Sequence, residues 1–298
     1  MRAGIQAPER LRKLRGSHLV FSRQRLNLPY AVTLLHPKDN RAMFAIPWEG
    51  VSLVGTTDLD HPWSPSQSEP YISQAEISYI LEAANATFPS LELNPSDIIS
   101  TFAGLRPVIN TGQADPSKES RAHVVWQESG LITVTGGKYT TFRIMAEEAL
   151  QIAQPSLPHP AGLERRKPYF ASLSTDKPSQ EVDLASWHHL CGRYGADANQ
   201  IIEGAAAGEN NPINGLVNLW SELRWAARNG AVEHLDDLLL RRVRLGILQP
   251  DGASGIIQRV REIVQPELGW DDERWQAEYS RYRDIYNQAY SPSPDGSR

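Results

Sequence analysis

The clearest pattern of apolar and polar positions lies between Tyr30 and Asp58. Three apolar runs alternate there with two polar turns, in the order AVTLL, PKDN, AMFAI, PWEG and VSLVG. Short apolar runs bounded by Pro, Gly, Asn and Asp are typical of strands joined by turns, so this segment predicts a β-meander. Before it, residues 1–15 lead into the apolar stretch His18 to Phe21 without a turn or cap signal, and we expect a first strand there that begins in mid-domain.

The next segments predict one helix and further strands. Ser73 stands three residues before Glu76, the spacing of a capping box, and apolar residues follow at helical intervals, so we expect a helix over about 73–88. Residues 98–108 have the pattern of a strand that ends at Arg106-Pro107. Residues 122–127 and 131–135 flank the turn Glu128-Ser129-Gly130, and we expect this hairpin to join the same sheet.

A change of pattern divides the chain. After Thr135 come a glycine turn and a helix through Ile152, with Thr140 and Thr141 as candidate N-caps. The proline-rich stretch 155–180 is typical of a linker, and 182–290 shows helical periodicity, for example at Leu216, Leu219, Leu223 and Ala226. We therefore expect an α+β fold: a mixed or antiparallel sheet with helices over 1–154, a linker over 155–180, a small all-α domain over 181–290 and a disordered tail over 291–298.

Composition and charge narrow the classes of function. The chain has 298 residues and a net charge of -5, without a basic stripe that would indicate nucleic acid binding. Cys191 is the only cysteine, which excludes an internal disulfide and a cysteine-based zinc site and fits a reducing, cytoplasmic compartment. No stretch reaches membrane-spanning length. His188-His189 has the pattern of a solvated helix pair, and no histidine spacing predicts a metal site.

The segment Thr135-Gly136-Gly137-Lys138-Tyr139-Thr140-Thr141 is the strongest candidate for chemistry. Paired glycines let a ligand approach the backbone, and a following helix offers N–H groups and a positive dipole end to an electron-rich group. Such a group could be the pyrimidine edge of a flavin, with Lys138 supporting its charge. The alternative is an ordinary turn that needs glycine for its dihedral angles.

Two arginines and one histidine are further candidates. Arg106 lies in Ala103-Gly104-Leu105-Arg106-Pro107, where the glycine leaves room beside the chain, and a guanidinium there could bind phosphate or stabilise an alkoxide. Arg121 could reach the same pocket. For both, a surface ion pair is the alternative. His18 could accept a proton from a substrate hydroxyl, although structural histidines are commoner.

The closing turn of the meander, Gly55-Thr56-Thr57-Asp58, carries two hydroxyls and a carboxylate. It could serve a site or simply end a strand as an Asx-type turn.

Taken together and in order, these motifs resemble FAD-dependent glycerol-3-phosphate dehydrogenases, members of the D-amino-acid-oxidase-like flavoprotein group. The resemblance runs through RGSHLV, IPWEGVSLVGTTDLD, TFAGLRPVI, SRAH and LITVTGGKYTTFRIMAEEA, and continues into ELRWAARNGAVEHLDDLLLRRVRLGI. It covers nearly the whole chain.

The resemblance implies roles for particular residues. Gly136, Gly137, Lys138 and Thr140 would line the pyrimidine side of FAD. Arg106 would face glycerol 3-phosphate, with Arg121 and Lys138 also on the substrate. His18 would handle the proton of the C2 hydroxyl while hydride passes from C2 to flavin N5. The resemblance also implies a quinone acceptor and peripheral contact with the inner face of the cell membrane, and it allows a homodimer.

The sequence departs from that family in one respect. It has no GxGxxG turn between a strand and a helix, the element that holds the FAD pyrophosphate. We therefore expect a truncated C-terminal part, or a gene-prediction fragment, that holds FAD poorly by itself and is inactive in isolation. The alternatives are a flavin oxidase of another small acid and a non-catalytic module that binds a phosphorylated metabolite.

Overall fold

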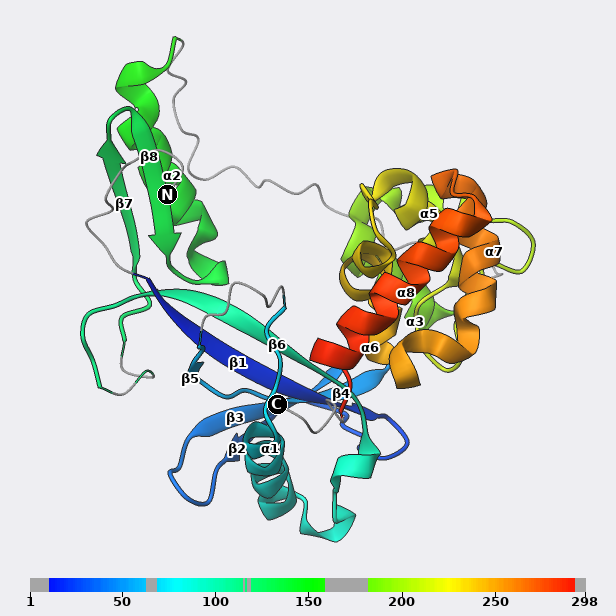
Figure 1. The fold of residues 1–298 in the computed structure, drawn as a ribbon, viewed down its shortest axis with the longest axis horizontal. Helices are drawn as coiled ribbons and strands as arrows, with labels where there is room; N and C mark the ends of the chain where they lie inside the picture. The colour runs from blue at the N-terminus through cyan, green and yellow to red at the C-terminus, as the bar shows by residue number, and fades with distance from the viewer. Residues whose placement is uncertain (1–10, 63–68, 115, 117–118, 159–181, 293–298) are drawn as a thin grey trace. The chain divides into compact units, whose positions relative to one another are not determined.

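The computed structural model describes residues 11–62, 69–114, 116, 119–158 and 182–292 (Figure 1). Its strands are β1 (Leu11–Ser22), β2 (Val32–Leu35), β3 (Ala42–Trp48), β4 (Val51–Gly55), β5 (Leu59–Asp60), β6 (Ile98–Ile109), β7 (His123–Glu128) and β8 (Leu131–Gly136). Its longer helices are α1 (Gln74–Thr87), α2 (Phe142–Ala153), α3 (Leu184–Tyr194), α5 (Trp220–Asn229), α7 (Ile257–Leu268) and α8 (Asp272–Ala289). The shorter ones include α4 (Ala198–Glu203), a π-helix η7 (Asp237–Arg242) and α6 (Leu245–Leu248).

The chain divides into two compact units. The hairpin unit comprises residues 1–16, 58–67 and 104–171, and the core unit comprises residues 17–57, 68–103 and 172–298. β1 and β6 each run from one unit into the other, and they pair with each other.

The core unit contains the predicted meander. β2, β3 and β4 pair antiparallel in chain order, and β4 then pairs with β1, with Leu19 opposite Val54. α1 lies against β2 and β4 (Figure 1). The meander, the first strand and the helix expected over 73–88 are thus confirmed.

β1 is buried on both faces of the sheet. Leu19 and Phe21 pack in one core with residues of α1, whereas Val20 packs in a second core with Leu239 and Val260 from the C-terminal helices. Successive side chains of a strand point to opposite faces, so one continuous apolar run supplies two cores. The helices after residue 182 therefore share a core with the sheet.

A buried carboxylate joins α1 to β1 and to the turn after β4. Ser73 and Glu76 form the predicted capping box of α1. The Glu76 side chain also accepts hydrogen bonds from the Ser17 hydroxyl and the Thr57 hydroxyl, each at 2.7 Å, and Glu76 is only 2% exposed. Thr57 accepts a further bond from the Ser17 N–H at 3.0 Å. Thr57 thus has a structural role in the turn.

Two expectations for the helical region need correction. Leu216 and Leu219 fit the helical period of the following segment, but α5 begins only at Trp220. The Glu222 carboxylate accepts from the Leu219 N–H at 2.8 Å, which fixes the helix start there. His189 is not solvated as expected: its Nε2 lies 3.2 Å from a Glu222 oxygen and its side chain is 9% exposed. Only His188 is exposed.

The hairpin unit departs from the expected single sheet. β7 and β8 pair with each other from His123–Gly136 to Glu128–Leu131 and form a separate two-stranded sheet, because the sheet of β1 to β6 includes neither strand. α2 packs against both strands. β6 also extends past Pro107 to Ile109, beyond its predicted end. β6 is an edge strand that pairs with β1, and edge strands tolerate proline because the side that faces no partner has no ladder hydrogen bond to lose.

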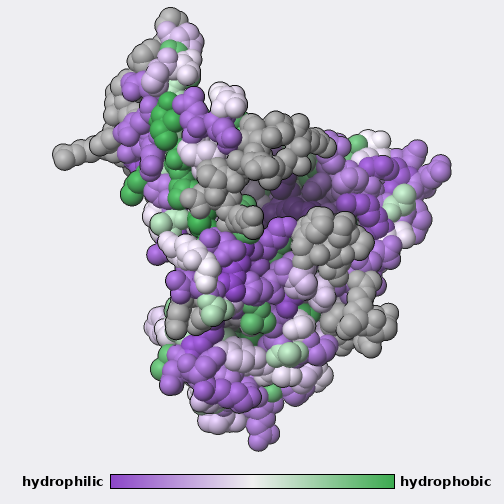
Figure 2. Space-filling view, turned by 60° about the vertical axis from the view of Figure 1, so that its left-hand side comes forward, coloured by the Kyte–Doolittle hydropathy of each residue, from purple (hydrophilic) through white to green (hydrophobic). Residues whose placement is uncertain are grey.

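Apolar side chains of this hairpin and helix are exposed. No described residue of β7, β8 or α2 is buried. Figure 2 shows hydrophobic side chains gathered on this part of the surface. They include Leu131, Val134, Phe142, Ile144 and Leu150, each at least 40% exposed.

The fold class predicted from the sequence is confirmed, since a largely antiparallel sheet with helices is followed by a helical region. The domain boundaries stay a prediction, and most of the expected linker and tail, at 159–181 and 293–298, lies outside the described residues. Within the described ranges, no helix has both the length and the apolar content needed to cross a membrane.

Candidate functional site

The hairpin unit contains a pocket that brings most of the candidate residues together. Its volume is about 320 Å³. The side of β6 contributes Arg106 and its neighbours, Arg121 precedes β7, and the turn after β8 contributes Gly136, Gly137 and Lys138. Segments that are 15 to 30 residues apart in the chain thus line one cavity, and they place three cationic side chains around it.

Asp58 joins the two arginines of the pocket. Its Oδ1 lies 3.2 Å from Nη1 of Arg106, and its Oδ2 lies 2.8 Å from Nη2 of Arg121. The Asp58 side chain is fully buried, whereas those of Arg106 and Arg121 are 29% and 43% exposed. This differs from a surface ion pair, in which both partners are exposed. The sequence left open whether the turn at Asp58 serves a site or only ends a strand, and it could not show these partners, which lie 48 and 63 residues away.

Gly16 on β1 provides the room for the Arg106 guanidinium. A Cβ atom at Gly16 would lie 2.3 Å from Arg106 Nη2, which is closer than any real contact. The sequence pointed instead to Gly104, but a Cβ there would meet nothing within 4 Å. The glycine that matters therefore comes from the neighbouring strand, which local sequence could not reveal.

We expect Gly16→Ala to displace the Arg106 guanidinium. The atoms that would clash belong to the end of a flexible side chain, so the backbone can stay in place and stability should change by less than about 1 kcal/mol. Binding of a phosphate compound should weaken about tenfold, since a charge-assisted hydrogen bond is lost. Titration calorimetry and thermal melts check both parts. Gly104→Ala is the matched control and should bind like the wild type; equal affinities for all three proteins would contradict the expectation.

The paired glycines have a structural reason for being glycine. Gly136 and Gly137 have φ of 73° and 80°, which other residues seldom adopt. A Cβ at Gly136 would lie 2.5 Å from the Ala122 carbonyl oxygen, and one at Gly137 would lie 2.4 Å from Met145 Sδ. Protein atoms therefore occupy the space beside both glycines. Their backbone nevertheless lines the pocket, so the turn can serve both purposes.

The helix after this turn begins differently from the expectation. A short 3₁₀ turn, η4 (Tyr139–Thr141), precedes α2. Thr141 occupies the N-cap position of α2, but its hydroxyl accepts from the Lys138 N–H at 3.0 Å and caps no amide of α2. Thr140 lies in the 3₁₀ turn and is not among the residues that line the pocket.

His18 belongs to the core unit. Its ring stacks on Phe102, with ring centroids 4.8 Å apart and an interplanar angle of 13°. A Cβ at Gly55 would lie 2.4 Å from the His18 ring, so this glycine gives the imidazole its space. The pocket described above is lined by hairpin-unit residues alone, and the role of His18 stays a prediction.

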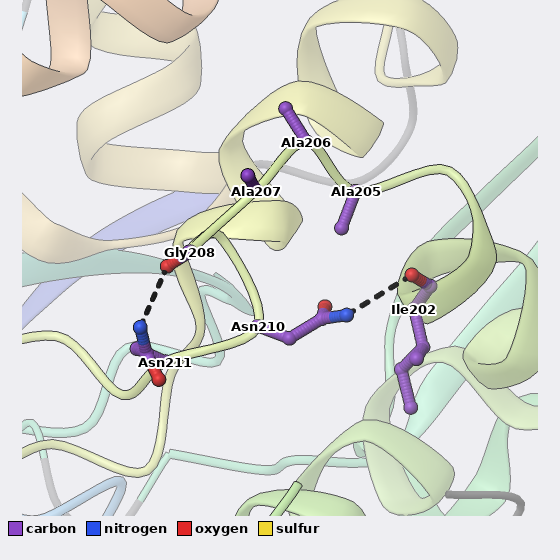
Figure 3. Close-up of a pocket in the computed structure, with 7 residues that line it drawn as sticks. All are labelled: Ile202, Ala205, Ala206, Ala207, Gly208, Asn210 and Asn211. Carbon is purple, nitrogen blue, oxygen red and sulfur yellow. Dashed lines mark hydrogen bonds between the residues drawn. The ribbon is translucent and has the colours of Figure 1, made fainter. Parts of the chain in front are cut away.

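A cavity in the helical region offers less chemistry than the pocket of the hairpin unit. No group of three or more His, Cys, Asp or Glu side chains within the described segments could hold a metal ion. A cavity of about 540 Å³ in the helical region is lined by residues 202, 205–208, 210 and 211 (Figure 3). Asn210 donates to the Ile202 carbonyl and Asn211 to the Gly208 carbonyl, and no lining residue is ionisable. That cavity therefore lacks an acid, a base or a charge for catalysis.

Comparison with known families agrees with this geometry. The family model described as FAD dependent oxidoreductase matches residues 2–151. The chain belongs to this family. A second family model, described as the C-terminal domain of alpha-glycerophosphate oxidase, matches residues 134–275. FAD is the cofactor of this oxidoreductase family, so the resemblance drawn from the ordered motifs is confirmed.

Individual members of the family are also similar to this chain. The glycerol-3-phosphate dehydrogenase of Mycobacterium leprae (strain TN) is 33% identical over 289 residues, which is 91% of this chain and 48% of the relative. The mitochondrial glycerol-3-phosphate dehydrogenase of Macaca fascicularis is 32% identical over 83% of this chain and 36% of its own length. The chain thus spans about half the length, or less, of these curated relatives.

A solved structure is also similar to this chain. The glycerol-3-phosphate dehydrogenase from Bacillus halodurans, solved in complex with FAD, superimposes with a TM-score of 0.74 and 25% sequence identity. The match covers 98% of this chain and 60% of that one.

The pocket fits FAD only in part. The turn at Gly136 and Gly137 and the Lys138 cation suit the electron-rich edge of a flavin ring. A dinucleotide also needs a cradle for its pyrophosphate, usually a glycine-rich turn before a helix. The described residues contain no such turn after a strand of the main sheet, so they suit one end of the cofactor.

Proposed function

We propose that this chain provides the substrate-side part of an FAD-dependent glycerol-3-phosphate dehydrogenase. The observation that carries the proposal is the pocket lined by three cations, Arg106, Arg121 and Lys138, of which the two arginines pair with one buried carboxylate, Asp58. Three cations against one carboxylate leave an excess of two positive charges, which suits a phosphate dianion. Membership of an FAD-dependent family and similarity to glycerol-3-phosphate dehydrogenases support this choice of substrate.

In this proposal each candidate residue has a role in oxidising glycerol 3-phosphate to dihydroxyacetone phosphate. Arg106, Arg121 and Lys138 bind the phosphate ester, and Arg106 also stabilises the developing alkoxide on C2. His18 accepts the proton of the C2 hydroxyl as the hydride leaves C2. Gly136, Gly137 and Lys138, together with Thr140 beside the pocket, would hold the pyrimidine side of FAD, which would supply the hydride acceptor.

Electrons then pass to a quinone, with the protein at the inner face of the cell membrane. This part of the proposal depends on similarity to the family alone.

Complementation tests the proposal. We expect this chain, produced together with a separate polypeptide that carries the N-terminal, FAD-binding half of a relative, to co-purify with flavin absorbance and to reduce a dye when glycerol 3-phosphate is added. By itself the chain should bind glycerol 3-phosphate but hold little FAD and reduce no dye. The matched control is the same complex with Arg106→Ala, which should keep the flavin and lose at least about a hundredfold in rate.

Three other results would direct the assignment elsewhere. Hydrogen peroxide release with a different small acid would indicate an oxidase. Binding of glycerol 3-phosphate without turnover in the flavin-loaded complex would indicate a non-catalytic module for phosphorylated metabolites. No binding of glycerol 3-phosphate in any form would contradict the proposal.

A further inference from the structure

We propose that Asp58 is the positioning residue of this pocket: its buried carboxylate holds Arg106 and Arg121 in the arrangement that receives a phosphate group. The inference deepens the proposed function, on which it rests for the choice of a phosphate ester. It goes beyond that function because Asp58 would act on the ligand only indirectly, through Arg106 and Arg121.

The geometry of Asp58 suits this task. Each carboxylate oxygen contacts a different arginine, Oδ1 at 3.2 Å and Oδ2 at 2.8 Å. One side chain therefore fixes the spacing between two guanidinium groups that come from different segments of the chain. The carboxylate is fully buried behind them, while both guanidinium groups remain partly exposed and line the pocket.

The packing around Arg106 also restricts its guanidinium. Gly16 lets the guanidinium lie against the β1 backbone, so Arg106 is held between that backbone and Asp58. Arg121 is more exposed, at 43%, and lies outside any strand or helix. Without the carboxylate we expect Arg121 to lose its orientation more completely than Arg106.

Electrostatics gives the carboxylate a second effect. Two guanidinium groups that face one cavity repel each other, and a buried carboxylate between them offsets that repulsion before any ligand arrives. A phosphate group then meets cations that are already oriented, so less conformational entropy is lost on binding. Loss of Asp58 leaves more positive charge but poorer order, and we expect the loss of order to dominate because bidentate recognition depends on orientation.

A double-mutant cycle tests the inference without flavin. Titration calorimetry measures the binding of glycerol 3-phosphate and, separately, of inorganic phosphate to the full chain. We expect Asp58→Asn to weaken binding about tenfold or more, and Asp58→Glu, which keeps the charge, to recover part of the loss. In an Arg121→Ala background, Asp58→Asn should cost no more than about threefold, because one of the two groups it positions is gone.

The control residue lies two positions after Asp58, in β5. Asp60 also pairs with an arginine, Arg12, but lies outside the pocket, so Asp60→Asn should bind like the wild type. If Asp58→Asn and Arg121→Ala weaken binding independently, so that their factors multiply, the positioning role is wrong. If Asp58→Asn does not fold, the cycle is run with Asp58→Glu, for which the same non-additivity is expected.

The proposed substrate and the proposed role of Asp58 can be overturned separately. A wild type that binds inorganic phosphate but not glycerol 3-phosphate would overturn the proposed substrate, and the cycle run with phosphate would still decide the role of Asp58. A multiplicative cycle with strong binding of glycerol 3-phosphate would overturn only the role of Asp58. Binding of neither anion would overturn both.

Discussion

Asp236→Asn is expected to lower the free energy of unfolding by about 3 kcal/mol at pH 7, one of the two largest effects that we anticipate. Asp236 is 2% exposed and accepts hydrogen bonds from Arg241 and from Arg281 of α8. The asparagine amide offers one acceptor where the carboxylate offers two, and its NH₂ group would face a guanidinium. A buried group would be left without a proper partner, which is the costly case for a polar network.

The effect of Asp236→Asn should depend on pH. Burial alone would raise the pKa of Asp236, but the hydrogen bonds and charges of Arg241 and Arg281 outweigh it and hold the pKa below the ordinary value of 3.8. A lowered folded-state pKa stabilises the protein above the unfolded-state pKa, and this contribution is lost as the pH falls through the folded-state value. The difference between wild type and variant should therefore be constant above about pH 5 and narrow below about pH 4.

Urea unfolding at several pH values measures this difference. Asp251→Asn is a suitable control, because Asp251 also pairs with an arginine, Arg283, but its side chain is 60% exposed. Its φ of 49° also suits asparagine, so the change should cost less than about 1 kcal/mol. A cost for Asp236→Asn that is no larger than for Asp251→Asn would show that the buried network does not stabilise the fold as we argue.

Glu76→Ala should have a comparable effect, a loss of about 3 kcal/mol in the free energy of unfolding. The Glu76 carboxylate accepts from the Ser17 hydroxyl, the Thr57 hydroxyl and the Ser73 N–H and hydroxyl. Removing it leaves buried donors on β1 and on the turn after β4, and it removes half of the capping box of α1. Three elements are thus weakened by one substitution.

The control for Glu76→Ala lies on the same helix. Glu82 pairs with Lys38 on the surface, and its side chain is 37% exposed. Glu82→Ala keeps the helix propensity change the same but should cost less than about 1 kcal/mol. Thermal and urea unfolding of the three proteins measure the contrast. Similar losses for both variants would mean that helix propensity, rather than the buried network, determines the effect.

Much of this fold follows from local pattern. The meander over 32–55, the capped helix α1 and the hairpin β7–β8 depend on periods and turn residues that lie within a few positions of each other. The start of α5 did not follow, because Leu216 and Leu219 are buried by tertiary packing without being helical. The prediction that the hairpin joins the main sheet was wrong. No local signal specifies which strands pair when they lie 20 or more residues apart in the chain.

Some residues of the candidate site could be predicted from local motifs and others could not. Arg106, Arg121, Gly136, Gly137 and Lys138 were recognised from motifs, and the fold brings all five to one pocket. Asp58 and Gly16 were not recognised as parts of it. Their importance depends on contacts with Arg106, which lies 48 and 90 residues away, and such contacts exist only once β1 and β6 are paired.

The double-sided burial of β1 has a consequence for how this protein can be divided experimentally. The strand belongs to both cores: Val20 packs with the C-terminal helices, and Leu19 and Phe21 pack with α1. A fragment that contained only the helices would lose β1 and expose Leu239 and Val260, which pack in the same core as Val20. The stability of each core therefore depends on the other. A fragment that began near residue 180, where the sequence pattern changes, would contain the C-terminal helices without the strand against which they fold.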